Sequence, residues 1–302
     1  MTKSFKSKSK IYSTLCFFAL ISSVILYSQP SFALAKLGHQ VVCQLAFDHL
    51  STAKQHRVTQ LLHAVPRKQQ TLINQYNHNR ADSPITFAKA CTWADAVKNQ
   101  KAFKQYNTWH YMNVSRELTR ITSKPLCSKN CIPQAILTHQ KQLQTIPRSW
   151  ESAQALLFLG HWLADIHQPL HVSYASDLGG NKIRLVETKS NCKNLHAYWD
   201  SCLMKSAGRT QNEWVESLTA QWNSISIPKF YYQQVWDWAN ESYQIVRQAD
   251  FQYCQITNQG ECKQTASSIK LADNYPNKHL PIMEKQLLKA AKRLTRILES
   301  TL

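Results

Sequence analysis

Histidine and aspartate residues at helical spacing mark the stretch HWLADIHQPLH, from His161 to His171. Residues four apart lie on one face of a helix, so His161 and Asp165 would project side by side. Pro169 ends this helix, and His171 could turn back towards the same point just beyond it. An imidazole beside a carboxylate suits a divalent metal ion. The stretch therefore indicates a metal site in an apolar setting.

A second pair of the same form lies in NLHAYWDS, where His196 and Asp200 are four residues apart. Alone, either pair would more often form a surface hydrogen bond or ion pair than a metal site. Together with HQPLH, the two pairs favour two helices that face one metal cluster. His110, between two aromatic residues in NTWHYMNV, is by itself more typical of a packed core histidine.

The first 33 residues have the pattern of a secretory signal peptide. Four lysines precede an apolar segment from Ile11 to Tyr27, and Ser31-Phe32-Ala33 offers small residues for cleavage. We predict cleavage after Ala33, rather than a membrane anchor, and export to the periplasm or the medium. Because the signal carries four lysines and no acid, the formal net charge falls from +18 to +14. This charge favours polyanionic partners, although a generally basic exported protein is the alternative.

Cysteine usage agrees with export. Of nine cysteines, Cys16 lies in the signal, which leaves an even number, and such a set in an exported chain predicts disulfides. Close spacing suggests Cys127 with Cys131, Cys192 with Cys202 and Cys254 with Cys262, and leaves Cys43 with Cys91. Eight cysteines nevertheless allow roughly a hundred pairings.

Hydrophobic periodicity predicts that helices position these residues. The expected helices cover 38–50, 55–64, 85–99, 132–144, 211–225, 229–249 and 277–302, with a central helix through His161. An extended segment is expected at 107–114, and a β-hairpin at 176–191 with Gly179-Gly180-Asn181 as its turn. No repeat, low-complexity linker or glycine-rich phosphate loop is present. The sequence predicts one mainly α-helical domain over 34–302, with a short β-hairpin and disulfides.

Six short motifs resemble, in type and order, the S1/P1 family of trinuclear-zinc single-strand nucleases. They are GH at 38–39, WAD at 93–95, WHY at 109–111, HxxxDxHQPLH at 161–171, DxGGN at 177–181 and NLHxxWD at 194–200. The resemblance runs from about Leu34 to Asp200. It implies the helical fold of the phospholipase C/P1 nuclease type.

The resemblance also implies three Zn²⁺ ions and their ligands. One zinc would be held by Asp95, His110, His161 and Asp165, its neighbour by His171, His196 and Asp200, and the third by His39, Asp165 and the amine and carbonyl of Leu34. Family members commonly have Trp as the mature first residue, five positions before the histidine, and Leu34 stands five positions before His39. Cys43 and Cys91 occupy positions that some members bridge.

By the same resemblance, the protein would be a zinc-dependent endonuclease that cleaves single-stranded DNA and RNA to 5′-phosphates, with 3′-nucleotidase activity. Asp95 would orient the attacking water. Lys98 stands where fungal members have an Arg that steadies the developing charge, and a Lys ammonium lacks the bidentate geometry of a guanidinium. Tyr111 would stack on a base, with a buried packing aromatic as the alternative reading, and Asn113 replaces a base-binding Asp.

Two other functions compete with this one. Zinc-dependent phospholipase C has a related fold and zinc triad, but the WHY motif with Asn113 and the basic charge favour nucleic acid. An exported zinc-binding protein without catalysis is the second alternative. We expect a monomer without a membrane anchor after processing. His167 lies on the wrong side of the central motif for a ligand and is expected to be structural. Six further histidines lack an acidic partner at ligand spacing and are expected to be ordinary surface or packing residues: His49, His56, His63, His78, His139 and His279.

Overall fold

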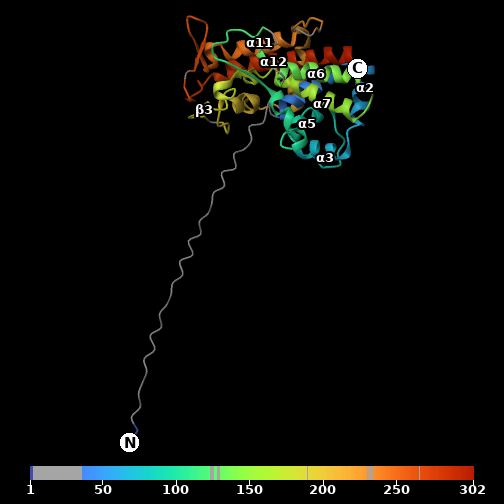
Figure 1. The fold of residues 1–302 in the computed structure, drawn as a ribbon, viewed down its shortest axis with the longest axis horizontal. Helices are drawn as coiled ribbons and strands as arrows, with labels where there is room; N and C mark the ends of the chain where they lie inside the picture. The colour runs from blue at the N-terminus through green and yellow to red at the C-terminus, as the bar shows by residue number, and fades with distance from the viewer. Residues whose placement is uncertain are drawn as a thin grey trace. The chain divides into compact units, whose positions relative to one another are not determined.

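Helices form most of the computed structural model, which describes residues 1–2, 36–122, 126–127, 130–188, 190–229, 231, 234–264 and 266–302 (Figure 1). The α-helices are α1 Lys36–Asp48, α2 Thr52–Leu62, α3 Arg67–Tyr76, α4 Phe87–Ala90, α5 Trp93–Val97, α6 Ile132–Thr145, α7 Trp150–Asp165, α8 Leu195–Ala197, α9 Leu203–Ser206, α10 Gln211–Ala220, α11 Gln234–Val246 and α12 Tyr275–Thr301. Shorter 3₁₀ segments are η1 Lys101–His110, η3 Pro169–His171, η4 Ala175–Asp177, η6 Trp222–Ser224 and η7 Ala249–Phe251, and η5 Tyr198–Cys202 is a π-turn. The predicted mainly α-helical fold is confirmed.

The central helix is α7, and it packs against α1, α2, α5, α6 and α12. A capping box between Ser149 and Ser152 starts it. Every residue from Ala155 to Asp165 is buried, which is expected of a helix that is apolar on all sides. Each large apolar side chain buried here contributes about 1.5–3 kcal/mol to folding. His161 and Asp165 are thus held inside the core.

Short strands place the segments that follow the histidines. Strand β1 (Met112–Val114) pairs in parallel with β2 (Val172–Tyr174), so the chain after His110 runs beside the chain after His171. Strand β3 (Arg184–Leu185) pairs in parallel with β6 (Ser268–Ile269). Strands β4 (Cys254–Ile256) and β5 (Cys262–Gln264) form an antiparallel hairpin.

The hairpin predicted at 176–191 is therefore wrong in its position. Leu178, Gly179 and Gly180 all have positive φ angles, and the Asp177 carboxylate accepts the Gly180 N–H, which closes a compact turn on itself. The strand that follows this turn pairs in parallel with β6 and forms an antiparallel bridge to Asn194, which lies beyond the predicted hairpin. The antiparallel hairpin of the structure lies in the last third of the chain, where no motif had marked it.

Two other sequence predictions need correction. The helix expected at 85–99 is split into α4 and α5, because Cys91 and Thr92 interrupt it. The segment expected to be extended from 107 is 3₁₀-helical up to His110, and only Met112–Val114 is a strand. Helix α3 was missed because it is polar and buries only two residues, Ile73 and Asn74.

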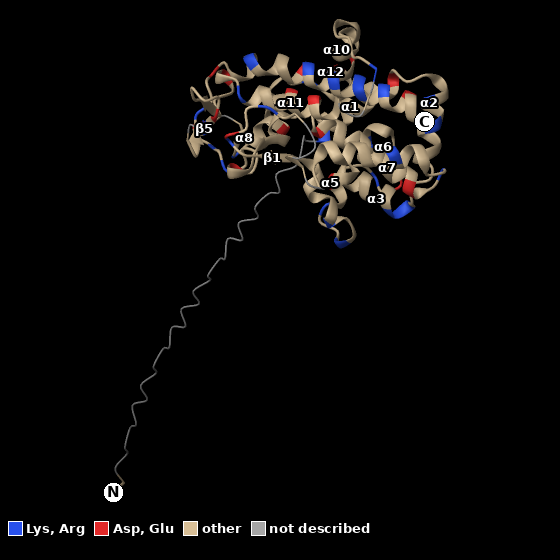
Figure 2. Cartoon of the chain, turned by 45° about the horizontal axis from the view of Figure 1, so that its top comes forward, with Lys and Arg blue, Asp and Glu red and all other residues tan. Residues whose placement is uncertain are grey.

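All four expected disulfides are present. They join Cys43 to Cys91, Cys127 to Cys131, Cys192 to Cys202 and Cys254 to Cys262. The bond from Cys43 to Cys91 ties α1 to the end of α4, and Gly160 of α7 packs directly against both sulfurs. Among the described residues, no helix has the length and apolarity that a membrane span requires. Basic residues lie along α12 and on several other elements (Figure 2).

Candidate metal centre

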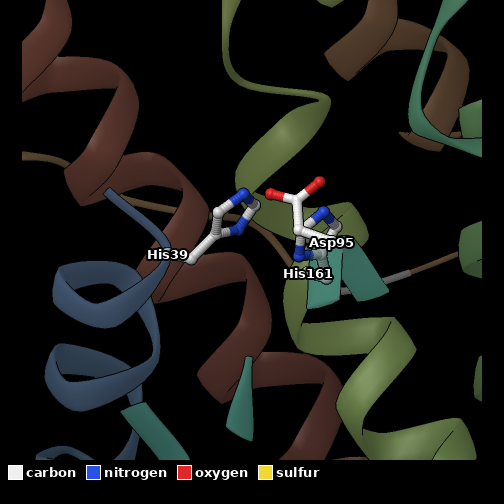
Figure 3. Close-up of side chains that lie close together, drawn as sticks. All are labelled: His39, Asp95 and His161. Carbon is white, nitrogen blue, oxygen red and sulfur yellow. The ribbon is translucent and has the colours of Figure 1, made fainter. Parts of the chain in front are cut away.

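Three helices bring His39, Asp95 and His161 together in the interior. His39 lies in the first turn of α1, Asp95 on α5 and His161 on α7, and their side chains converge (Figure 3). The rings of His39 and His161 are stacked with their centroids 3.8 Å apart. All three residues are buried, and one ligand atom of each lies within 4.8 Å of the others. A cation could bind between them.

Asp165 lies at the middle of the cluster, surrounded by four imidazoles. Its Oδ1 lies 3.4 Å from His39 Nε2 and 3.6 Å from His171 Nδ1, and its Oδ2 lies 3.0 Å from His110 Nδ1 and 3.2 Å from His161 Nε2. Burial would raise the pKa of Asp165, but His161 and His171 lower it well below its ordinary value. Asp165 is therefore an anionic carboxylate in the protein core.

The second predicted pair forms its own group with His171. His196 Nε2 lies 3.2 Å from Asp200 Oδ2, and His171 Nε2 lies 3.5 Å from Asp200 Oδ1. Burial would raise the pKa of Asp200, but His196 and His171 lower it to about 2. Burial likewise opposes the charged form of His171, but Asp165 and Asp200 raise its pKa to about 9.

The orientation of the histidines is fixed from outside the cluster. Three of them place Nδ1 at 2.7 Å from a backbone carbonyl: His161 on Cys91, His171 on His110 and His196 on Gly179. A carbonyl can only accept, so Nδ1 donates the proton and Nε2 is the ring nitrogen that faces the carboxylates. His171 Nδ1 therefore donates to the His110 carbonyl oxygen, which is closer than the Asp165 carboxylate at 3.6 Å.

Several buried polar atoms of the cluster have no hydrogen-bond partner. They are both ring nitrogens of His39, Oδ1 of Asp165, Nε2 of His171 and Oδ2 of Asp200. Buried polar atoms are normally paired, so orphaned atoms that converge on common points fit bound cations. The described residues contain three groups of candidate ligands whose atoms lie close together: His39 with Asp95 and His161, His110 with His161 and Asp165, and His171 with His196 and Asp200. Imidazole nitrogen and carboxylate oxygen donors suit zinc.

Asp95 is held by two further side chains. Its Oδ1 accepts from Lys98 Nζ at 3.3 Å, and its Oδ2 accepts from Tyr76 OH at 3.3 Å. Burial would raise the pKa of Asp95, but His161 and Lys98 lower it. Sequence reasoning missed Tyr76, because it ends the unpredicted helix α3 and only the fold brings it to Asp95.

A cavity of about 410 Å³ leads from the cluster to solvent. Asp95, Lys98, His171, Tyr111 and Asn113 are among the residues that line it. Tyr111 is 38% exposed, so it is not the buried packing aromatic that was the alternative reading. The sequence-predicted substrate residues therefore share one cavity with the candidate ligands.

Gln168 also contacts the cluster and was not predicted. Its amide donates to Asp200 Oδ1 at 2.6 Å, and its own oxygen accepts from the Leu170 N–H. His167 points away, as expected, with Nδ1 on the Leu163 carbonyl and Nε2 on Arg293. Leu34 lies outside the described residues, so its role beside His39 stays a prediction.

Comparison with known proteins gives a consistent family. The S1/P1 Nuclease family profile matches residues 35–302. Endonuclease 2 of Arabidopsis thaliana is 31% identical over 62% of this chain and 62% of its own length, which is less than two thirds. Endonuclease 1 of Arabidopsis thaliana is 25% identical over 99% of this chain and 95% of its own. Nuclease S1 of Aspergillus oryzae is 24% identical over 62% of this chain and 60% of its own.

Proposed function

The chain belongs to the S1/P1 nuclease family, and on this premise we propose that it is a zinc-dependent endonuclease of single-stranded DNA and RNA. It leaves 5′-phosphate products and also acts as a 3′-nucleotidase. The observation that carries the proposal is the convergence of buried histidine and aspartate side chains, several with unpaired atoms, beside an open cavity that His171 and other candidate ligands line.

Three Zn²⁺ ions are proposed to occupy this centre. The first is held by Asp95, His110, His161 and Asp165, the second by His171, His196 and Asp200, and the third by His39, Asp165 and the Leu34 terminus. When bound, such ions supply an acidified water and neutralise phosphoryl oxygens. The fixed Nε2 orientation of His161, His171 and His196 supports this assignment.

The remaining residues of the cavity act on the substrate. Asp95 orients the attacking water, and Lys98, 3.3 Å from it, places a cation where negative charge develops. Tyr111 stacks on an unpaired base. This contact does not depend on which base is present, because every base has an aromatic face. Asn113 offers both a donor and an acceptor to the base edge. Since stacking needs an unpaired base, single strands are the preferred substrate.

Export is part of the proposal. Residues 1–33 act as the signal peptide, and the mature domain spans 34–302, in the periplasm or outside the cell, as a monomer. Four disulfides support this location, because such bonds persist in oxidising compartments.

One assay separates the proposed function from its alternatives. Purified processed protein is given single-stranded DNA, the matching duplex and phosphatidylcholine under the same conditions. We expect rapid cleavage of the single strand, slow cleavage of the duplex and no release from the lipid. Turnover of phosphatidylcholine alone would establish the phospholipase C reading, and no turnover of any substrate would favour a non-catalytic zinc-binding protein.

A further inference from the structure

Asp177 is a buried carboxylate outside the candidate ligand groups. It ends η4, opens the DxGGN motif and is only 1% exposed. Burying a carboxylate is costly unless it is paired and hydrogen-bonded. Asp177 has three donors: an ion pair from Arg116, the Tyr253 hydroxyl at 2.5 Å and the Gly180 N–H at 2.8 Å. With these three donors in place, the Asp177 carboxylate has a fixed position and can fix the groups that it binds.

What Asp177 holds is one particular peptide unit. The Gly180 N–H and the Gly179 C=O belong to the same planar peptide and point to opposite sides of it. The N–H donates to Asp177 Oδ1, and the C=O accepts from His196 Nδ1 at 2.7 Å. Asp177 and the candidate metal ligand His196 therefore form hydrogen bonds to opposite sides of the same peptide unit.

This peptide needs such a restraint because both of its residues are glycines. Gly179 and Gly180 have φ angles of +62° and +81°, and without a Cβ their peptide rotates with little steric resistance. A side chain at Gly179 is excluded, since its Cβ would lie 2.5 Å from the Leu170 carbonyl oxygen. If the peptide turned, His196 would lose the acceptor that keeps its proton on Nδ1 and its Nε2 towards the cluster.

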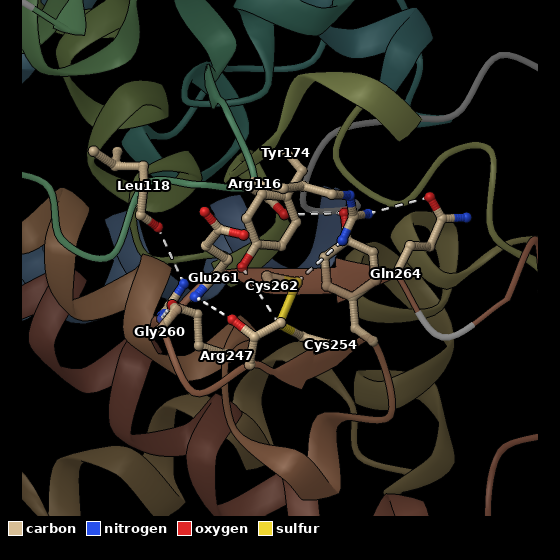
Figure 4. The surroundings of a disulfide bond; sticks show 12 residues. Arg116, Leu118, Tyr174, Arg247, Cys254, Gly260, Glu261, Cys262 and Gln264 are labelled. Atoms are coloured by element: carbon tan, nitrogen blue, oxygen red, sulfur yellow. Dashed lines mark hydrogen bonds between the residues drawn. A yellow bond between two sulfur atoms is a disulfide. The ribbon is translucent and has the colours of Figure 1, made fainter.

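Asp177 is in turn linked to the last third of the chain, directly through Tyr253 and indirectly through Arg116. The Arg116 guanidinium lies 4.4 Å from the Tyr174 ring and 5.4 Å from the Tyr253 ring, and Arg116 also contacts Cys262 (Figure 4). Its backbone carbonyl accepts the Cys262 N–H at 2.9 Å. The disulfide-linked hairpin of β4 and β5 thereby reaches the metal centre through Arg116 and Asp177.

We propose that Asp177 is a positioning residue for the second metal ion: it locks the peptide between Gly179 and Gly180 so that its carbonyl aims His196 Nε2 at the site. This role rests on the proposed metal centre. It assigns a task to the first residue of the DxGGN motif, which touches neither metal nor substrate. It also explains why an arginine and a tyrosine from distant segments converge on one buried carboxylate.

The test measures zinc, not turnover. Zinc per chain and the rate of zinc release to a chelator are compared in wild type, Asp177→Ala and Asp177→Asn. Loss of a residue that orients a metal ligand weakens binding about 10–100-fold, so Asp177→Ala should release one of the three ions at least about tenfold faster. Asp177→Asn keeps an acceptor for the Gly180 N–H and should show a smaller acceleration. If Asp177→Ala does not fold, Asp177→Asn carries the test alone.

Two controls separate positioning from general destabilisation. Glu241→Gln breaks a different ion-pair cluster and should leave zinc release unchanged. His196→Ala should lose the second ion, and Asp177→Ala added to it should cause no further loss. Release of all ions together, or an undiminished effect of Asp177→Ala in the His196→Ala background, would overturn the role. Equal release by wild type and both Asp177 variants would overturn it while leaving the metal centre intact, whereas wild type without zinc would overturn both.

Discussion

At the scale of single residues, the cluster is unlike a set of structural ion pairs. Asp165 faces four imidazoles and no lysine or arginine. Burial, with help from the neighbouring His161, lowers the pKa of His39 to about 4, so this ring is neutral and has two unpartnered nitrogens. A neutral imidazole beside a buried carboxylate is a good pair of ligands and a poor ion pair.

Removing one ligand should therefore abolish activity without unfolding the domain. Asp200→Asn keeps the shape of the side chain but loses the anionic oxygen, and we expect cleavage of single-stranded DNA to fall at least about a hundredfold. Helix content by circular dichroism should stay near the wild-type value, because four disulfides still hold the fold. Asp48→Asn, at an exposed position on α1, is the control and should keep full activity. Near-normal turnover by Asp200→Asn would refute its place among the ligands.

At the scale of elements, sequence reasoning worked where one apolar pattern runs without interruption. Helices α1, α6 and α12 begin and end within about two residues of the expected positions. It failed at α3, whose two buried residues give no periodic signal, and at the turn after Asp177, where a side chain closes the backbone. His161, Asp165, His171, His196 and Asp200 were found because their spacing is local, whereas His39, Asp95 and His110 were predicted only from the resemblance to a family. Tyr76, Gln168 and the partners of Asp177 depend largely on contacts between distant segments, which spacing cannot predict.

Because α7 lies very close to α1 and α4, we expect a Gly→Ala substitution in α7 to destabilise the protein, which is the opposite of its usual effect in a helix. Gly→Ala inside a helix normally stabilises by about 0.5–1 kcal/mol. At Gly160, however, the added Cβ would lie 2.5 Å from Cys91 Sγ and 2.9 Å from Cys43 Sγ. Overpacking of this kind costs about 1–3 kcal/mol, so Gly160→Ala should lower the free energy of unfolding measured in urea. An unchanged or increased value would show that α7 does not press on this disulfide.

The contact between α11 and α12 makes stability depend on pH. Glu241 lies 2.8 Å from Arg293 and 2.9 Å from Lys289. Burial would raise the pKa of Glu241, but Arg293 and Lys289 lower it to about 2. A carboxyl whose pKa is lower in the folded state stabilises the fold above its unfolded pKa of about 4.3, and this contribution is lost as the pH falls towards 2.

Glu241→Gln should accordingly destabilise the protein most at neutral pH. Because the side chain is partly exposed, solvent screening limits the effect to about 1 kcal/mol. Urea unfolding at pH 7, 4 and 2.5 should show the difference between wild type and variant shrinking as the pH falls. A difference that stays constant over this range would mean that the carboxylate charge does not carry the effect.

At the scale of the whole molecule, the cluster joins segments that are far apart in the sequence. Its residues come from α1, α5, α7, α8, η5 and the 3₁₀ segments that end at His110 and His171, so an ion bound there links segments from His39 to Asp200. Basic residues, by contrast, lie on several elements (Figure 2). We expect the net positive charge to attract a polyanion, whereas selectivity would depend on the cavity that Tyr111 and Asn113 line.

Metal removal should then lower the stability of the entire domain. A ligand that binds only the folded state at about 100 times its dissociation constant adds about 2.7 kcal/mol. For a domain of this size, about 1 kcal/mol shifts the melting temperature by about 2–4 °C, so stripping even one ion of this affinity should lower it by about 5–10 °C. We expect calorimetry after chelation to show a single transition at lower temperature, because the ligands come from one continuous core. Zinc should restore the original value and magnesium should not, since the donors are imidazole nitrogens as well as carboxylates. A melting temperature indifferent to chelation would mean that these side chains hold no tightly bound ion.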